Sequence, residues 1–184
     1  MIVLLSGSGT TLENFFTHID SRGLPAAVDL VVSSRADAYG LARAKRRGAE
    51  TAVVASKDFR QKNGDGETRP DWDAMSSRLN EVILPRRPDL VCFAGFMCYY
   101  VLPPELQGKT MNIHPALIPA FCGKGMYGHR VHEAVVEAGV KVSGCTVHFV
   151  NNEYDAGPII LQRTCPVYAS DTPEDVAERV GVAE

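Results

Sequence analysis

Short apolar runs alternate with segments of helical periodicity along most of this chain. The runs cover residues 1–5, 28–32, 51–55 and 89–94, and apolar side chains recur at helical spacing after the first of them, at Leu12, Phe15, Phe16 and Ile19. Parallel strands need crossover connections, which are usually helices. The alternation therefore predicts an α/β fold: an open, mostly parallel twisted sheet, Rossmann-like, with helices on both faces.

The later part of the chain departs from this alternation. Residues 109–113 predict another strand, which Pro115 and Pro119 prevent from continuing. Strands are also predicted at 142–150 and 158–167 with no helix between them, so the far edge of the sheet should be mixed or antiparallel. Further helices are predicted at 37–47, 72–84, 129–138 and 172–182, the last with Asp171 as its N-cap.

One polar segment interrupts the pattern without dividing it. Residues 56–71 are rich in charged and turn-forming residues, which predicts a surface loop rather than a linker between domains. A length of 184 residues is typical of one domain with a sizeable core. We therefore expect a single domain over residues 1–184.

Composition and charge exclude several classes of protein. The chain is 45% apolar and 22% charged, as soluble globular proteins are, and its net charge of −3 lacks the basic surplus of nucleic-acid-binding domains. No apolar run reaches the roughly 18 residues of a membrane span, and residues 1–5 lack the basic segment of a signal peptide. These features predict a cytoplasmic protein, monomeric or homodimeric, without nucleic-acid or membrane partners.

The metal-ligand pattern is weak. The five cysteines are widely spaced, with no C-x-x-C pair, which favours reduced thiols. His129 and His132 are three residues apart, but no third ligand is near them in sequence, and zinc requires three or four protein ligands. We therefore predict no metal site.

The first candidate for chemistry is the S-G-S-G-T-T turn between the first strand and helix. Glycine lets backbone N–H groups approach an anion, and the start of a helix adds a partial positive charge, so Ser8, Gly9, Thr10 and Thr11 suit a phosphate. The turn lacks the third glycine of a dinucleotide fingerprint and the lysine of a P-loop. A tight turn without a ligand is the alternative.

The second candidate is M-N-I-H-P-A-L-I-P. In an extended strand Asn112 and His114 project from the same face, just where Pro115 ends the strand. The carboxyl ends of strands form the ligand crevice of open α/β sheets, so an amide and an imidazole there suit polar chemistry. The alternative is a buried histidine satisfied by a backbone carbonyl, with Asn112 as a turn former.

The third candidate is the acidic segment N-N-E-Y-D-A-G-P. Its carboxylates are Glu153 and Asp155, and Gly157 and Pro158 mark the exit into the next strand. A carboxylate beside His114 would favour the imidazolium and raise the pKa of that ring. A solvated hairpin loop is the alternative.

Several stretches together resemble the phosphoribosylglycinamide formyltransferase family, the folate-dependent enzymes of purine synthesis. They are V-L-L-S-G-S-G-T-T-L, A-D-A-Y-G-L-A-R-A, L-V-C-F-A-G-F-M, M-N-I-H-P-A-L-I-P-A-F and V-H-F-V-N-N-E-Y-D-A-G-P-I-I-L-Q. The N-I-H-P and D-A-G-P elements together are specific to the wider folate formyltransferase superfamily. The resemblance implies transfer of a formyl group from 10-formyltetrahydrofolate to the amino group of glycinamide ribonucleotide, a small phosphorylated substrate.

The resemblance also implies roles for residues. Asn112, His114 and Asp155 match the family's catalytic set; Ser8, Gly9, Thr10 and Thr11 fall on the loop for the substrate phosphate, and Glu184 on a glutamate that holds the ribonucleotide. The walls of the folate pocket fall on Phe96, Met97, Cys98, Tyr99, Leu102, Asn151, Asn152 and Glu153. No metal is implied.

The chain departs from the family pattern at several positions. Thr11 replaces the usual asparagine, and Cys98 stands where better-known bacterial members carry arginine. Relatives continue beyond Glu184, which leaves open a naturally short member and a chain without its C-terminal tail. The loop at residues 123–128 also differs, and its Lys124 suggests a basic lid, with an ordinary solvated loop as the alternative.

Other functions remain open at this point. Hydrolysis of 10-formyltetrahydrofolate and formyl transfer to another amine use the same chemistry, although those enzymes usually carry additional domains. A nucleotide-binding module without catalysis would leave Asn112, His114 and Asp155 without a use.

Overall fold

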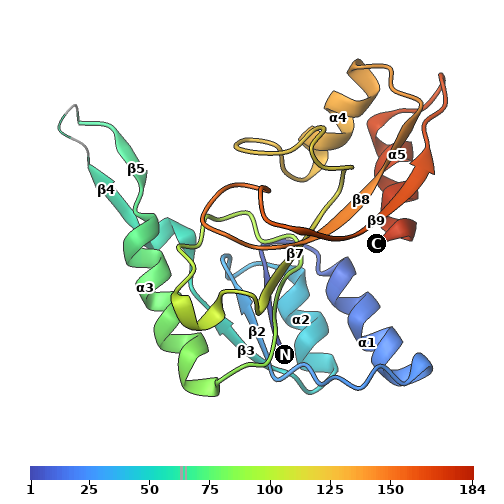
Figure 1. The fold of residues 1–184 in the computed structure, drawn as a ribbon. Coiled ribbons are helices and arrows are strands. Elements are labelled where there is room, and N and C mark those ends of the chain that lie inside the picture. Colours follow the sequence, from blue (N-terminus) through green and yellow to red (C-terminus); the bar gives the residue numbers. More distant parts are fainter. Residues whose placement is uncertain (63, 65) are drawn as a thin grey trace. The chain divides into compact units, whose positions relative to one another are not determined.

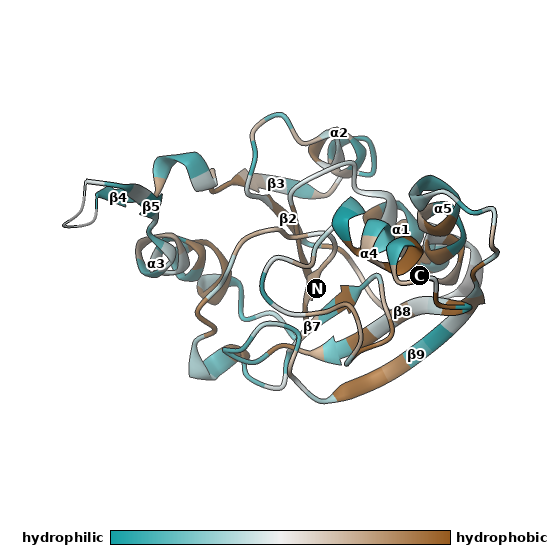
Figure 2. Cartoon of the chain, turned by 90° about the horizontal axis from the view of Figure 1, so that it is seen from above, coloured by the Kyte–Doolittle hydropathy of each residue, from teal (hydrophilic) through white to brown (hydrophobic). Residues whose placement is uncertain are grey.

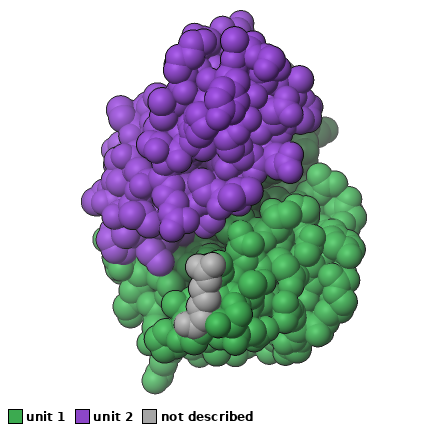
Figure 3. Space-filling view, turned by 90° about the vertical axis from the view of Figure 1, so that its right-hand side faces the viewer, with its two compact units in different colours: residues 1–110 green, residues 111–184 purple. Residues whose placement is uncertain are grey.

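The computed structural model describes residues 1–62, 64 and 66–184. It divides into two compact units, Met1–Thr110 and Met111–Glu184, which Figure 3 colours separately. Each unit has its own strands and helices.

The first unit is built on four parallel strands in the order β3-β2-β1-β6. They are β1 (Ile2–Leu5), β2 (Leu30–Ser33), β3 (Glu50–Val53) and β6 (Val91–Phe93). Every residue of β1, β2 and β6 is buried, as expected for parallel strands covered on both faces. The predicted parallel sheet is therefore confirmed.

Helices cover both faces of these strands. In Figure 1, α3 (Trp72–Ile83) lies on one side, and α1 (Thr10–Arg22) and α2 (Tyr39–Arg46) lie on the other. The short 3-10 helices η1 (Ser56–Asp58), η2 (Leu84–Arg86) and η3 (Pro104–Leu106) complete the unit. Met75, Leu79 and Ile83 of α3 are buried and recur at helical spacing, which gives the helix one buried face.

The segment at residues 56–71 is more ordered than the loop we predicted. It contains η1 and a two-stranded antiparallel hairpin of β4 (Arg60–Lys62) and β5 (Thr68–Pro70), in which Gln61 pairs with Arg69. Both strands are exposed throughout, so the hairpin has no alternation of apolar and polar residues to reveal it. Asn63 and Asp65, which belong to the predicted loop, lie outside the described residues.

The second unit is antiparallel, which confirms the prediction for the far edge. β7 (Thr110–His114), whose first residue closes the first unit, pairs with β8 (Val142–Phe149), and β8 pairs with β9 (Ile159–Pro166). The helices α4 (His129–Glu137) and α5 (Pro173–Ala183) pack against each other, and α5 packs on β8 and β9. The buried core comprises Val135, Cys145, Cys165, Val167, Val176 and Val180.

The start of α5 differs by one residue from the prediction. The N-cap of α5 is Thr172 rather than Asp171, because Thr172 and Asp175 form a reciprocal capping box, whereas Asp171 pairs with Arg179.

The apolar residues at the start of β9 remain exposed and form the brown band of that strand in Figure 2. Within the described part of the chain, no helix is both long and apolar enough to span a membrane.

Candidate active site

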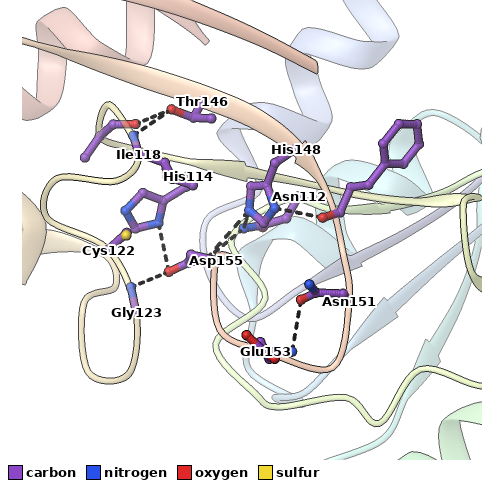
Figure 4. Close-up of polar contacts among 12 residues, drawn as sticks. Asn112, His114, Ile118, Cys122, Gly123, Thr146, His148, Asn151, Glu153 and Asp155 are labelled. Atoms are coloured by element: carbon purple, nitrogen blue, oxygen red, sulfur yellow. Dashed lines mark hydrogen bonds and ion pairs between the residues drawn. The ribbon is translucent and has the colours of Figure 1, made fainter. Parts of the chain in front are cut away.

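Two paired strands place four polar side chains side by side in the second unit. Asn112 of β7 lies opposite His148 of β8, and His114 lies opposite Thr146. Directly paired residues of antiparallel strands project from the same face, and residues two apart along one strand do so as well. The four side chains therefore share one face, as Figure 4 shows.

Asp155 reaches this face from the loop between β8 and β9. One carboxylate oxygen, Oδ2, lies 3.6 Å from His114 Nδ1. The other, Oδ1, lies 3.5 Å from Asn112 Nδ2 and 3.7 Å from His148 Nε2. The structure thus brings together the three residues that the sequence singled out, with Asp155 at the centre (Figure 4).

The backbone of this loop is shaped by close packing. Asp155 itself adopts a left-handed conformation, with φ of 52°. A Cβ atom on Gly157 would lie 1.7 Å from the carbonyl oxygen of Phe149, which no side chain can tolerate. Glycine at position 157 therefore allows the return of the chain that carries Asp155 to the cluster.

The Asp155 carboxylate is held in its charged form. Its side chain is only 14% exposed, and this burial alone would raise its pKa. Donors and positive charge around it, among them the Gly123 N–H at 2.9 Å and the His114 ring, outweigh burial, so the pKa of Asp155 lies below its usual value. The group therefore acts as a hydrogen-bond acceptor at neutral pH.

His114 has an acceptor beside each ring nitrogen. Its Nε2 lies 2.8 Å from the carbonyl oxygen of Phe121, which can only accept, so Nε2 carries a proton. Its Nδ1 faces the Asp155 carboxylate, whose Oδ2 lies 3.6 Å away. The ring is 3% exposed, so the alternative from the sequence, a buried histidine bonded to a carbonyl, describes part of its environment correctly.

Sequence reasoning missed the residues that fix the turn after β7. The buried Thr146 hydroxyl donates to the carbonyl of Ala116 at 2.7 Å and accepts from the N–H of Ile118 at 3.1 Å. Gln162 Nε2 donates to the same hydroxyl at 3.0 Å. Thr146 and His148 could have been identified only from the pairing register of β7 with β8. No pattern in the sequence specifies that register.

The remaining residues of the acidic segment lie on the surface around Asp155. Asn151 Oδ1 accepts a hydrogen bond from the N–H of Glu153 at 3.0 Å, and Asn152 and Glu153 are exposed (Figure 4). Glu184, at the end of α5, is half-buried and donates its N–H to Val180.

The glycine turn of the first unit is a backbone site. Gly9 is the N-cap of α1 with φ of 74°, and it provides no side-chain cap for the first-turn amides of Thr10 and Thr11. A Cβ atom at Gly9 would lie 2.6 Å from the Cα of Gly40. Arg43 Nε donates to the carbonyl of Ser8 at 3.0 Å. N–H groups at a helix start combined with a nearby guanidinium favour an anion.

The segment after β6 follows a second left-handed glycine, Gly95. Ser6 Oγ accepts the N–H of Met97 at 2.8 Å, and Met97 is 52% exposed. Burial raises the pKa of the Cys98 thiol, against the opposing effect of hydrogen bonds with serines. Of the other predicted folate residues in this segment, Phe96, Cys98 and Tyr99 are half-buried and Leu102 is buried.

The histidine pair on α4 is not arranged as a metal site. His129 Nε2 lies 3.2 Å from Glu174 and 3.8 Å from Glu133 on an exposed surface. Burial, with the charges of His129 and His114, lowers the pKa of His132. Among the described residues, no three histidine, cysteine or acidic groups are gathered as metal ligands.

The chain thus combines a parallel α/β unit with an antiparallel unit that carries the cluster of Asn112, His114 and Asp155. The family described as formyl transferase matches residues 1–184, and the chain belongs to this family.

Particular members of the family are similar to this chain. It is 40% identical over 184 residues to the trifunctional purine biosynthetic protein adenosine-3 of Gallus gallus, covering 99% of this chain but 17% of that protein. It is 38% identical to the phosphoribosylglycinamide formyltransferase of Haemophilus influenzae, covering 96% of this chain and 77% of the relative. The solved glycinamide ribonucleotide transformylase 1 of Symbiobacterium toebii aligns with a TM-score of 0.82 and 38% identity, covering 98% and 79% of the two chains.

Proposed function

We propose that this chain transfers the formyl group of 10-formyltetrahydrofolate to the amino group of glycinamide ribonucleotide in de novo purine synthesis. The observation that carries the proposal is the meeting of Asn112, His114 and Asp155 on one face of the second unit. The names of the family and of its similar members support the choice of reaction and acceptor.

The reaction begins when the primary amine of the acceptor attacks the formyl carbon. The carbonyl oxygen becomes an oxyanion in the tetrahedral intermediate, which the Asn112 amide stabilises as a hydrogen-bond donor and the charged His114 ring stabilises through its positive charge. One preorganised donor of this kind is typically worth about 3 to 4 kcal/mol. Both groups are positioned before the reaction, because each also contacts Asp155.

Asp155 has two functions in this scheme. Its charge keeps the His114 ring protonated and oriented. It also accepts a proton from the attacking amine, directly or through water, and this proton passes to the folate nitrogen as the carbon–nitrogen bond to the folate breaks. The scheme requires neither a metal ion nor a covalent enzyme intermediate.

The two substrates require further contacts. Ser8, Gly9, Thr10 and Thr11 would bind the phosphate through the start of α1, and Glu184 would bind the ribonucleotide. The walls of the folate pocket would comprise Phe96, Met97, Cys98, Tyr99, Leu102, Asn151, Asn152 and Glu153. A single functional domain, monomeric or homodimeric and cytoplasmic, fits this proposal.

A product-release assay tests the function. Purified protein is incubated with 10-formyltetrahydrofolate, and free tetrahydrofolate is measured with and without glycinamide ribonucleotide. We expect release only when the ribonucleotide is present. Equal release in its absence would show a hydrolase, and release with other amines alone would show a different acceptor.

A further inference from the structure

His148 is a buried histidine for which the proposed mechanism gives no function. It is 2% exposed and lies on β8 directly opposite Asn112. A buried polar ring must have partners for its nitrogen atoms, and the identity of those partners determines where its proton lies.

The partners of His148 fix its tautomer. Its Nδ1 lies 2.9 Å from the carbonyl oxygen of Phe149, so Nδ1 donates and carries the proton. The neutral ring then has its acceptor at Nε2, which lies 3.0 Å from Asn112 Nδ2, whereas Asp155 Oδ1 lies 3.7 Å away, beyond hydrogen-bond distance. The neutral ring with its proton on Nδ1 satisfies both contacts.

This tautomer in turn fixes the Asn112 amide. The amide nitrogen lies between two acceptors, His148 Nε2 at 3.0 Å and Asp155 Oδ1 at 3.5 Å. A rotation of the amide by half a turn would place its oxygen against both acceptors, which is unfavourable. The contact of the amide with His148 is the shorter of the two. The other N–H of the Asn112 amide makes only the long contact with Asp155, so it can donate to an oxyanion instead.

We propose that His148 is a positioning residue that holds the Asn112 amide with its N–H groups toward the reacting centre. The inference rests on the proposed function, because an oxyanion donor is useful only if the formyl carbon is attacked. His148 contacts neither substrate in this scheme and acts through Asn112 alone. It follows that His148 is required in its neutral form with an acceptor at Nε2.

Two substitutions test whether the side chain at position 148 must accept a hydrogen bond or need only fill space. In His148→Gln the side-chain oxygen can take the place of Nε2 and accept from Asn112, whereas His148→Phe fills the site without an acceptor. We expect kcat to fall about 10- to 100-fold in His148→Phe, as expected when a reacting group is misplaced, with KM for both substrates nearly unchanged. His148→Gln should recover most of this loss. An equal loss in both variants, with both folded, would overturn the inference.

A double-mutant cycle tests whether His148 acts through Asn112. Asn112→Ala should lower kcat, and adding His148→Phe to it should lower kcat no further, since the orientated amide is already gone. Additive losses would show that His148 has another role and would overturn the proposal. His129→Gln, an exposed histidine of the same unit, is the control and should have normal kcat.

Nitrogen NMR of the histidine rings provides a readout that does not depend on activity. We expect His148 in the wild-type protein to show a protonated Nδ1 and an unprotonated Nε2, and the Asn112 side-chain amide signals to shift in His148→Phe but much less in His148→Gln. The opposite tautomer would overturn the inference even if His148→Phe does not fold. Inactivity of the wild-type protein in the release assay, with the expected NMR result, would refute the proposed function alone.

Discussion

The polar cluster around Asp155 and the glycine turn before α1 are built from different parts of the chain. The cluster consists of side chains, in which the Asp155 carboxylate lies beside the His114 ring and accepts from the Asn112 amide. The turn is formed by the backbone. Gly9 adopts a left-handed conformation, and it lies so close to Gly40 that a Cβ atom on Gly9 would clash with the Gly40 Cα. The cluster should therefore depend on chemical identity, and the turn on backbone conformation.

This difference predicts opposite responses to substitution. An isosteric change that removes a charge should destroy the cluster and leave its fold unchanged. At the turn, polar side chains should be more tolerant, whereas one added methyl group at a left-handed glycine should disturb both the fold and anion binding. The predictions that follow test each side of this comparison.

Asp155→Asn is the strongest test of the cluster. It preserves shape but removes the charge beside His114 and the acceptor for a proton, so kcat should fall roughly 10²- to 10⁴-fold. Steady-state kinetics of tetrahydrofolate release measures this, and circular dichroism confirms folding. Glu133→Gln removes an exposed carboxylate of the same unit and is the control, with normal kcat. A normal rate in Asp155→Asn would refute the catalytic role.

Gly9→Ala tests the turn. The new Cβ atom would lie 2.6 Å from Gly40 Cα at a φ of 74°, and such strain costs about 1 to 3 kcal/mol of unfolding free energy. KM for the phosphorylated acceptor should rise more than kcat falls. Urea unfolding and kinetics measure the two effects.

Gly7→Ala is the matched control for this turn. A Cβ atom at Gly7 meets nothing within 4 Å, so its unfolding free energy should change by less than about 0.5 kcal/mol. If both variants behave alike, the turn does not depend on backbone conformation, and the contrast with the cluster is lost.

The sequence predicted the regular elements well because their signals are local. Apolar runs located β1, β2 and β6, and helical periodicity located α1 and α4. The hairpin of β4 and β5 escaped prediction because both strands are exposed, so no buried face imposes a pattern. The N-cap of α5 was misplaced by one residue because Asp171 and Thr172 are both good caps, and the carboxylate of Asp175 favours the latter.

The candidate site was predictable only in part. Spacing alone put Asn112 and His114 on one face, and the family resemblance added Asp155. His148 and Thr146 required the pairing of β8 with β7, which depends on contacts far apart in sequence. The bond from Gly123 to Asp155 depends on the path of a turn, for which the sequence contains no periodic signal.

The pH dependence of stability gives a second test of the cluster. Because the pKa of Asp155 is lower in the folded chain than its ordinary value of 3.8, its charged form stabilises the fold above that value. This contribution should be lost as pH falls through 3.8 and then through the lower folded pKa. Asp155→Asn lacks it at every pH. Thermal unfolding should therefore show a gap between wild type and Asp155→Asn at pH 7 that narrows toward pH 3. A constant gap would contradict the assignment.

Arg43→Gln should have the smallest effect, and it sharpens the comparison because Arg43 is a side chain that supports the backbone turn. Its guanidinium donates to the Ser8 carbonyl at 3.0 Å and pairs with Glu13 at 3.3 Å, but it is 24% exposed, so solvent weakens both contacts. We expect a loss of about 1 kcal/mol in unfolding free energy and a rise in acceptor KM of less than about tenfold. Arg46→Gln, on the same helix and bonded to Tyr39 instead, is the control for lost positive charge. If Arg43→Gln raised KM a hundredfold while Arg46→Gln did not, the guanidinium itself would be the phosphate ligand, and the turn, like the cluster, would depend on side-chain identity.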